Sequence, residues 1–191
     1  MANAIDDPKS AQRRLFRAER TAFVTGLPSG TRERLERDLA GMVAPLLTGY
    51  EQAASYAAVG TEIDPNRIAT LLPGHAVPLV GGRNLSFHVA ARAEMKPGVL
   101  GIPEPAASAP QVTPDLLLVP LLAVTLAGVR LGQGGGYYDR TLAALRTTGR
   151  ITAIGIAWDV QIADTLPRDP WDALLDWVAT PTRLVNCAEH R

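Results

Sequence analysis

Cysteine, net charge and long apolar runs are all scarce in this sequence of 191 residues. The single cysteine, Cys187, excludes an internal disulfide and does not indicate structural zinc, so a reducing compartment is expected. Lysine plus arginine and aspartate plus glutamate both number 19, so no overall field favours nucleic acid or an anionic membrane. Any site for anions must therefore come from local clustering of basic residues.

Apolar runs are also too short to cross a membrane. The longest, Leu116 to Val129, contains Pro120 and covers 14 residues, whereas a transmembrane helix needs about 20 apolar residues. The first residues include Asp6, Asp7 and Lys9 and have no apolar stretch, so no signal peptide is predicted. We therefore expect a cytoplasmic protein whose partners include neither a membrane nor a nucleic acid.

Hydrophobic periodicity predicts helices alternating with strands. Helices are expected over 10–24, 31–47, 64–72 and 138–145, and strands over 53–60, 76–80, 85–90, 115–120, 151–158 and 177–180. The prolines between Pro97 and Pro114 predict a surface loop. The expected fold class is α/β: one three-layer α/β/α domain over 1–191 with a mostly parallel, Rossmann-like sheet. Residues 1–8 are expected to be a flexible N-terminus and residues 182–191 a C-terminal tail.

The stretch RLGQGGGYYDR, Arg130 to Arg140, places four glycines in five positions. A predicted buried strand precedes it and a predicted helix follows, an arrangement that presents backbone N–H groups to a phosphate. The stretch lacks the Lys-Ser or Lys-Thr of a Walker A loop, and G-x-G-G-G differs from the dinucleotide pattern G-x-G-x-x-G. Two interpretations follow: a phosphate cradle of another type, or simply a tight turn. Asp139 is correspondingly either a Mg²⁺ ligand or a helix cap.

A basic face on the first predicted helix gives a second indication of an anion site. At about 100° per residue, Lys9, Arg13, Arg17 and Arg20 fall within roughly 80° of one another. Such a face is ordinarily solvated. If the helix lay beside the glycine loop, however, Lys9 and Arg13, which are one turn apart, would both be able to bind the same polyphosphate.

These residues together resemble the 5-formyltetrahydrofolate cyclo-ligase family, also called 5,10-methenyltetrahydrofolate synthetases. RLGQGGGYYDR is similar to the family signature, and Lys9 and Arg13 match its Lys-x-x-x-Arg. SYAAVGTEID resembles the segment with a substrate-contacting glutamate, here Glu62. PLVGGRNLSFHVA and GVLGIPEP resemble the middle of the fold. GIAWDVQIADTLPRDPWDALLDWVAT resembles the C-terminal block, with Asp172 at a metal-associated position.

The resemblance implies a ligase that uses ATP and Mg²⁺ to convert 5-formyltetrahydrofolate to 5,10-methenyltetrahydrofolate, ADP and phosphate. Phosphorylation would turn the formyl oxygen into a leaving group, and N10 of the folate would then close the ring. The substrate would come with or without a polyglutamate tail, and the protein would be a monomer or a weak homodimer. Two alternatives stay open: a non-catalytic or nucleic-acid-binding relative of the same fold, and an ATP-dependent enzyme for a related N-formyl compound.

The resemblance also implies roles for particular residues. Lys9, Arg130 and Tyr138 would be catalytic. ATP would be bound by Lys9, Arg13, Arg130, Leu131, Gly132, Gln133, Gly134, Gly135, Gly136, Tyr137 and Tyr138. The folate would be bound by Glu62, Gln133, Gly134, Gly135, Gly136 and Tyr137, and Mg²⁺ by Asp139 and Asp172. Val124 and Thr125 stand where the family usually has Phe and Asp, so packing or hydrogen bonding at the loop base is expected to differ.

Overall fold

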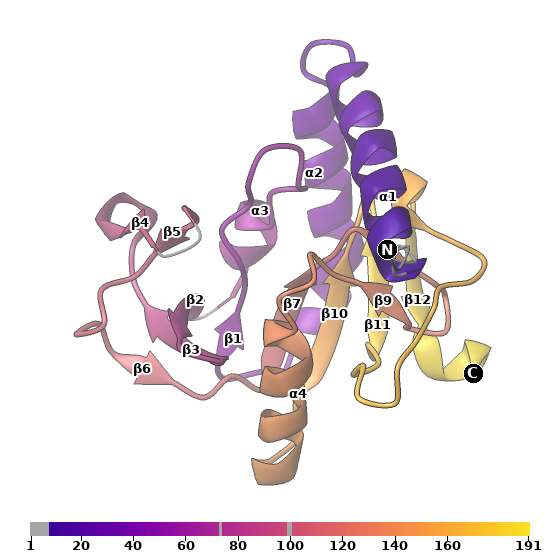
Figure 1. Ribbon diagram of the computed structural model, residues 1–191. Helices are drawn as coiled ribbons and strands as arrows, with labels where there is room; N and C mark the ends of the chain where they lie inside the picture. The colour runs from indigo at the N-terminus through magenta and orange to yellow at the C-terminus, as the bar shows by residue number, and fades with distance from the viewer. Residues whose placement is uncertain (1–7, 73, 99–100) are drawn as a thin grey trace, which may run out of the picture.

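An eight-stranded sheet forms the centre of the molecule, in the order β12-β11-β10-β7-β1-β2-β3-β6 (Figure 1). The structure is a computed structural model that describes residues 8–72, 74–98 and 101–191. The strands of the sheet are β1 (Ala53–Ala54), β2 (His75–Gly81), β3 (Asn84–Val89), β6 (Gln111–Val112), β7 (Leu116–Pro120), β10 (Thr152–Ile156), β11 (Trp177–Thr180) and β12 (Arg183–Asn186). The five strands in the middle of this order, β11, β10, β7, β1 and β2, pair in parallel. Strand β12 is antiparallel at one edge, and β3 and β6 are antiparallel at the other. The predicted α/β class with a mostly parallel sheet is confirmed.

Helices and two small hairpins surround this sheet. The α-helices are α1 (Pro8–Thr25), α2 (Thr31–Val43), α3 (Asn66–Ala69) and α4 (Tyr137–Thr148). The 3₁₀ helices are η1 (Ala44–Leu47), η2 (Arg92–Glu94), η3 (Asp159–Gln161) and η4 (Cys187–His190). The hairpins pair β4 (Lys96–Pro97) with β5 (Pro103–Glu104) and β8 (Ala123–Val124) with β9 (Arg130–Leu131). None of the helices in the described ranges has the length and apolar character needed to cross a membrane.

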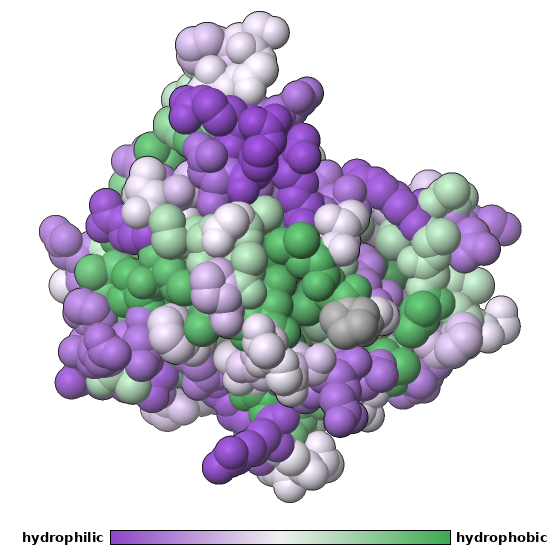
Figure 2. All heavy atoms as spheres, turned by 180° about the vertical axis from the view of Figure 1, so that it is seen from behind, coloured by the Kyte–Doolittle hydropathy of each residue, from purple (hydrophilic) through white to green (hydrophobic). Residues whose placement is uncertain are grey.

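Strand β7 is buried on both faces, which explains its uninterrupted apolar sequence. Leu116 and Leu118 belong to one core cluster, which includes Leu39 of α2. Leu117 belongs to a second cluster, which includes Leu142 of α4. Helices therefore cover both faces of the sheet and give three layers (Figure 1). Seen from behind, hydrophilic side chains gather over the α1–α2 hairpin, and a hydrophobic band lies below it (Figure 2).

The order of the parallel strands changes direction between β1 and β7. From β1 the chain adds β2 on one side, and it then returns to add β7 on the other side, followed by β10 and β11. The strands expected over 115–120 and 151–158 form β7 and β10, which pair in parallel at the centre of the sheet. In parallel sheets, ligands bind at the carboxyl ends of the strands, where the order reverses. The topology therefore directs attention to the segments that follow β1 and β7.

Three predicted segments differ from the structure. The strand expected over 53–60 is limited to β1, because the chain turns after it: the hydroxyl of Tyr56 donates to the carbonyl of Ile63 at 2.7 Å. The loop expected over 97–114 contains β5 and β6 and the end of β4. Residues 183–190, expected in a tail, form β12 and η4 instead, since Leu184 and Val185 pack on the two different core clusters. Residues 1–7 of the expected N-terminal segment lie outside the described residues.

Thr125 supplies hydrogen bonds in the turn between β8 and β9. Its hydroxyl accepts from the N–H of Val129 at 3.2 Å, and its carbonyl accepts from the N–H of Gly128 at 3.0 Å. Gly128 has a φ of 85° and lies so close to the chain that a Cβ there would be 2.6 Å from the Leu175 carbonyl oxygen. The fully buried Cys187 packs against the same glycine. The base of the glycine loop is thus held by a threonine and a close backbone contact.

Candidate functional site

A cavity of about 720 Å³ lies where the strand order reverses. Tyr56 and Ala57, which follow β1, line it together with Pro120 and Leu121 at the end of β7. The start of α1 and the start of α4 complete one side. All the site residues that the sequence predicted lie around this cavity: Lys9, Arg13, Glu62, Arg130, Leu131, Gly132, Gln133, Gly134, Gly135, Gly136, Tyr137, Tyr138, Asp139 and Asp172.

The glycine loop needs its glycines at the turn into α4. Gly134 and Gly136 have φ values of 104° and 66°, in the left-handed region that favours glycine. A Cβ at Gly135 would lie 2.7 Å from the Tyr137 ring, so this position also excludes larger residues. Gly136 is the residue immediately before α4, whose first backbone N–H groups have no partners within the helix. The loop is therefore both a tight turn and a group of N–H donors beside the cavity.

Asp139 lies in the first turn of α4 but does not cap the helix by its side chain. Its Oδ1 accepts hydrogen bonds from Nη2 of Arg130 at 2.6 Å and from the N–H of Ala173 at 3.1 Å. The Arg130 side chain is only 4% exposed, and it also donates to the carbonyl of Ala173. Burial lowers the pKa of Arg130, and the charge of Asp139 opposes that shift. The capping interpretation of Asp139 is therefore wrong.

The basic face of α1 lies against the glycine loop. Nζ of Lys9 is 2.6 Å from Oδ2 of both Asp169 and Asp172. Nε of Arg13 donates to the carbonyl of Gly132 at 3.1 Å. Burial lowers the pKa of Lys9, but the hydrogen bonds with the two aspartates outweigh it and leave the pKa raised, so Lys9 is an ammonium at neutral pH. The helix thus brings cations to the loop.

Two further arginines of α1 extend this contact. Nη2 of Arg17 donates to Oε1 of Gln133 at 2.7 Å, on the exposed side of the loop. Arg20 is 5% exposed, and its Nη1 lies 3.7 Å from Oε1 of Glu62. Nε2 of Gln133 donates to the same Glu62 oxygen at 3.4 Å. Glu62 therefore lies where α1, the glycine loop and the turn after β1 meet.

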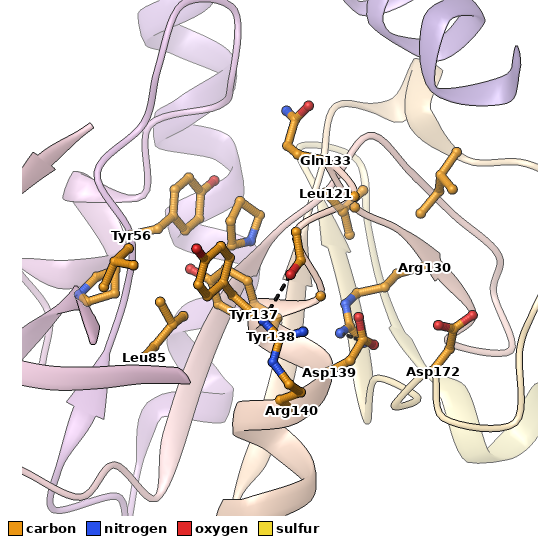
Figure 3. Close-up of a pocket in the computed structure, with 18 of the residues that line it drawn as sticks. Tyr56, Leu85, Leu121, Arg130, Gln133, Tyr137, Tyr138, Asp139, Arg140 and Asp172 are labelled. Carbon is orange, nitrogen blue, oxygen red and sulfur yellow. Dashed lines mark hydrogen bonds and ion pairs between the residues drawn. The ribbon is translucent and has the colours of Figure 1, made fainter. Parts of the chain in front are cut away.

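The far side of the cavity is apolar. Figure 3 shows Tyr56 and Leu85 at this end. It shows Arg130 and Asp172 at the other. Tyr138 lies between the two ends, and burial raises the pKa of its phenol, with the nearby charge of Glu62 acting in the same direction (Figure 3). Tyr138 therefore keeps its proton at neutral pH, and its hydroxyl is able to donate a hydrogen bond.

Sequence reasoning did not find several residues of the cavity. Besides Tyr56 and Leu85, these include Val80, Ile102, Glu104 and Asp169. Asp169 had a local signal, because it lies three residues before Asp172 and its N–H donates to the Asp172 carboxylate at 2.8 Å. The apolar residues had none, since β2, β3 and β5 come together only in the folded chain.

Comparison with known proteins identifies the family of the chain. A sequence model of the 5-formyltetrahydrofolate cyclo-ligase family matches residues 69–181. The chain is 34% identical over 176 residues to a 5-formyltetrahydrofolate cyclo-ligase of Mycolicibacterium smegmatis, covering 82% of this chain and 87% of that protein. The chain belongs to the 5-formyltetrahydrofolate cyclo-ligase family. The resemblance found in the sequence is confirmed.

Solved structures agree with the family assignment. The 5,10-methenyltetrahydrofolate synthetase of Aquifex aeolicus superposes with a TM-score of 0.77 and 27% identity, over 96% of this chain and 94% of that one. A synthetase of the same name from Mycoplasma pneumoniae, 23% identical, shares the fold with a TM-score of 0.69 over 91% of this chain and 98% of its own. Members of the cyclo-ligase family are ATP-dependent ligases of folate one-carbon metabolism, so the chain is an enzyme of this class.

Proposed function

We propose that the chain converts 5-formyltetrahydrofolate to 5,10-methenyltetrahydrofolate, using ATP with Mg²⁺ and releasing ADP and phosphate. The observation that carries this proposal is the composition of the cavity. One end has the glycine loop, the start of α4 and the cations Lys9, Arg13 and Arg130. The other end is apolar and suits a flat ring system, so one cavity has room for both substrates.

The loop and the cations would hold the triphosphate. N–H groups at the start of α4 and the positive end of its dipole favour phosphate oxygens. The backbone from Leu131 to Tyr138 would wrap the phosphates, and Lys9, Arg13 and Arg130 would stabilise the negative charge that moves during transfer. Lys9 and Arg130 contact aspartates in the structure, so the phosphates would take over part of these contacts.

Asp139 and Asp172 fit a magnesium ion. In each carboxylate the contacts described above use one oxygen, Oδ1 of Asp139 and Oδ2 of Asp172, and the second oxygen takes no part in them. Mg²⁺ is usually held by one or two carboxylates together with phosphate oxygens and water. Bound by Asp139 and Asp172, it would neutralise charge on the phosphates of ATP.

The reaction would proceed in two steps on the folate. The formyl oxygen attacks the γ-phosphorus, the bond to the bridging oxygen breaks, and ADP leaves. N10 then attacks the formyl carbon, the carbon–oxygen bond breaks, phosphate leaves with that oxygen, and the ring closes as N10 loses its proton. Tyr138, which keeps its phenolic proton, would donate a hydrogen bond near the transferred oxygen. Glu62 would contact the folate at the junction of the two ends, beside Gln133, Gly134, Gly135, Gly136 and Tyr137.

The decisive test is turnover of the purified protein with 5-formyltetrahydrofolate and MgATP. We expect methenyltetrahydrofolate, followed by its absorbance, and phosphate to form in equal amounts, and neither to form when ATP or Mg²⁺ is omitted. A related N-formyl compound without the pterin ring serves as the comparison substrate. Turnover of that compound alone would replace the proposed substrate, and ATP binding without any turnover would contradict the activity.

A further inference from the structure

Glu104 lies at the apolar end of the cavity, on β5. The residue is 7% exposed, and its Oε1 is a buried oxygen for which the described residues provide no hydrogen-bond partner. A buried carboxylate oxygen without a partner is costly, so native proteins seldom retain one unless something else pairs with it. The oxygen therefore marks a place where a ligand could supply the missing donor.

The surroundings of Glu104 supply little to stabilise its charge. Burial raises the pKa of its carboxyl, and a hydrogen bond with the backbone of Val80 offsets only part of that effect. Its neighbours along the cavity wall include Val80, Leu85 and Ile102, which are apolar. Only an added donor group, or a proton, would compensate the carboxylate in this environment.

Gly98 leaves the space that the Glu104 carboxyl occupies. A Cβ at position 98 would lie 2.0 Å from Cδ of Glu104, closer than any real contact, so the carboxyl packs directly on the backbone of β4 and the turn that follows it. Gly98 has no positive φ that would require a glycine for the turn itself. The absence of a side chain at position 98 thus leaves room for the Glu104 carboxyl in the wall of the cavity.

Glu62, the other carboxylate near the apolar end, is already engaged. Its Oε1 is shared by Gln133 and Arg20, and its Oε2 accepts from the N–H of Val59 at 3.1 Å. Glu62 therefore positions the glycine loop and contacts whatever lies beside that loop. The two carboxylates differ in that Glu104 keeps an oxygen for a ligand.

We propose that Glu104 recognises the pterin ring of the substrate by accepting hydrogen bonds from its ring N–H and its 2-amino group. This inference rests on the proposed function. In 5-formyltetrahydrofolate the formyl group on N5 and the 2-amino group point away from each other across the two fused rings. When the formyl oxygen faces the glycine loop, the amino edge faces away from it, toward the part of the wall that does not belong to the loop. Glu104 lines the cavity from β5, outside the loop. The unpartnered Oε1 has more than one lone pair, so it can accept from the ring N–H and the adjacent 2-amino group together.

The test compares Glu104→Gln with the wild type, and Glu51→Gln, at an exposed glutamate away from the cavity, is the matched control. We expect Glu104→Gln to raise the KM for 5-formyltetrahydrofolate about 10- to 100-fold, the usual loss for a charge-assisted hydrogen bond. The KM for ATP should change less than about twofold, because charge-assisted bonds to phosphate are untouched. An unchanged KM for the folate would overturn the proposal.

A ligand variant separates recognition from a structural role. The analogue of 5-formyltetrahydrofolate with a methyl group in place of the 2-amino group should bind wild type more weakly than the parent compound, as calorimetry would show. In Glu104→Gln the two compounds should bind almost equally. A purely structural glutamate would leave the discrimination intact in the variant, and this result would refute the inference. If Glu104→Gln does not fold, Glu104→Leu, which suits the apolar wall, takes its place in both measurements.

The outcomes also separate this inference from the proposed function. Absence of wild-type turnover would contradict the function, whereas the binding comparison does not need turnover. Wild-type turnover together with equal discrimination by both proteins would contradict only the role of Glu104.

Discussion

At one end of the cavity Lys9, Arg13 and Arg130 each contact a carboxylate or a carbonyl oxygen of the protein itself. At the other end Val80 and Leu85 offer mainly apolar area. The cationic end is therefore arranged in advance, because aspartates and carbonyls hold the cations apart at fixed positions. The apolar end provides a surface whose contribution grows with the area that a ligand covers. Substitutions at the two ends should consequently affect different substrates.

Asp139→Asn should have the largest effect. The amide can retain the hydrogen bonds from Arg130 and Ala173 but is a poor ligand for a hard cation. We expect turnover to fall more than about 100-fold, in the range seen when a charge-stabilising group is lost, with partial recovery at high Mg²⁺. Stability should fall as well, by about 1–3 kcal/mol, since Arg130 would be buried beside a neutral group.

Asp176→Asn is the matched control for this change. Asp176 also pairs with one arginine, Arg146, at 2.9 Å and accepts a hydrogen bond from a backbone N–H, that of Ala153, at 2.9 Å. It lies outside the residues that line the cavity. Urea unfolding should show a stability loss in both variants, and turnover should drop only in Asp139→Asn. Near-normal turnover of Asp139→Asn would contradict the metal role.

Lys9→Ala and Arg13→Ala should come next in size. Each substitution would remove a cation from the cationic end of the cavity. A charge-assisted contact of this kind is worth about 1.5–3 kcal/mol, or about 10- to 100-fold in binding. We expect the KM for ATP to rise by this factor and the KM for the folate to change little. Initial rates at varied ATP and fixed folate provide the measurement. If both KM values rose equally, the two ends would not be separate.

Leu85→Ala tests the apolar end. Leu85 is partly buried on β3 and packs against a core cluster while lining the cavity. Removing most of its side chain should raise the KM for 5-formyltetrahydrofolate about 3- to 10-fold through lost apolar contact. The KM for ATP should stay as in wild type when both are measured with the same assay. A larger effect on ATP than on the folate would contradict the assignment of this end.

Arg17→Ala should have the smallest effect. Arg17 lies one turn beyond Arg13 on the same face of α1, and its contact with Gln133 is exposed. Exposed polar contacts contribute little, so the KM for ATP should change less than about twofold. This variant is also the control for Arg13→Ala, because both changes remove one arginine from the same helix. A rise in the KM for ATP as large as that of Arg13→Ala would mean that the cationic end extends along α1 as far as Arg17.

The cationic end could be predicted from the sequence because its residues come from short, continuous segments. Arg130 to Asp139 form one stretch, and Lys9 and Arg13 lie one helical turn apart. Once α1 packs on the loop, all of them meet. The central strands could be predicted for a similar reason, since Leu116 to Val119 are buried on both faces.

The apolar end could not be predicted in this way. Glu104 is a single carboxylate in a segment rich in proline, and it enters the cavity only because β5 packs beside β2. Tyr56 belongs to an apolar run that reads as a strand, yet its hydroxyl stabilises a turn. Strand β12, near the C-terminus of the chain, has only a short apolar stretch between polar residues. Its pairing with β11 is what makes this segment a strand. The Glu104 case depends on a contact between distant segments, whereas the other two depend on a local turn and a hairpin that the apolar pattern alone does not reveal.

Cys187 gives the enzyme an internal reporter of unfolding. The thiol is fully buried, and burial raises its pKa to about 11, so the protein in its native form offers neither access nor thiolate to an alkylating reagent. Modification at neutral pH would then proceed only through molecules that have opened around η4 and β12. Because this is the only thiol in the sequence, the labelling rate would follow a single opening reaction. Added nucleotide or folate should slow that rate in proportion to how strongly each ligand favours the closed chain.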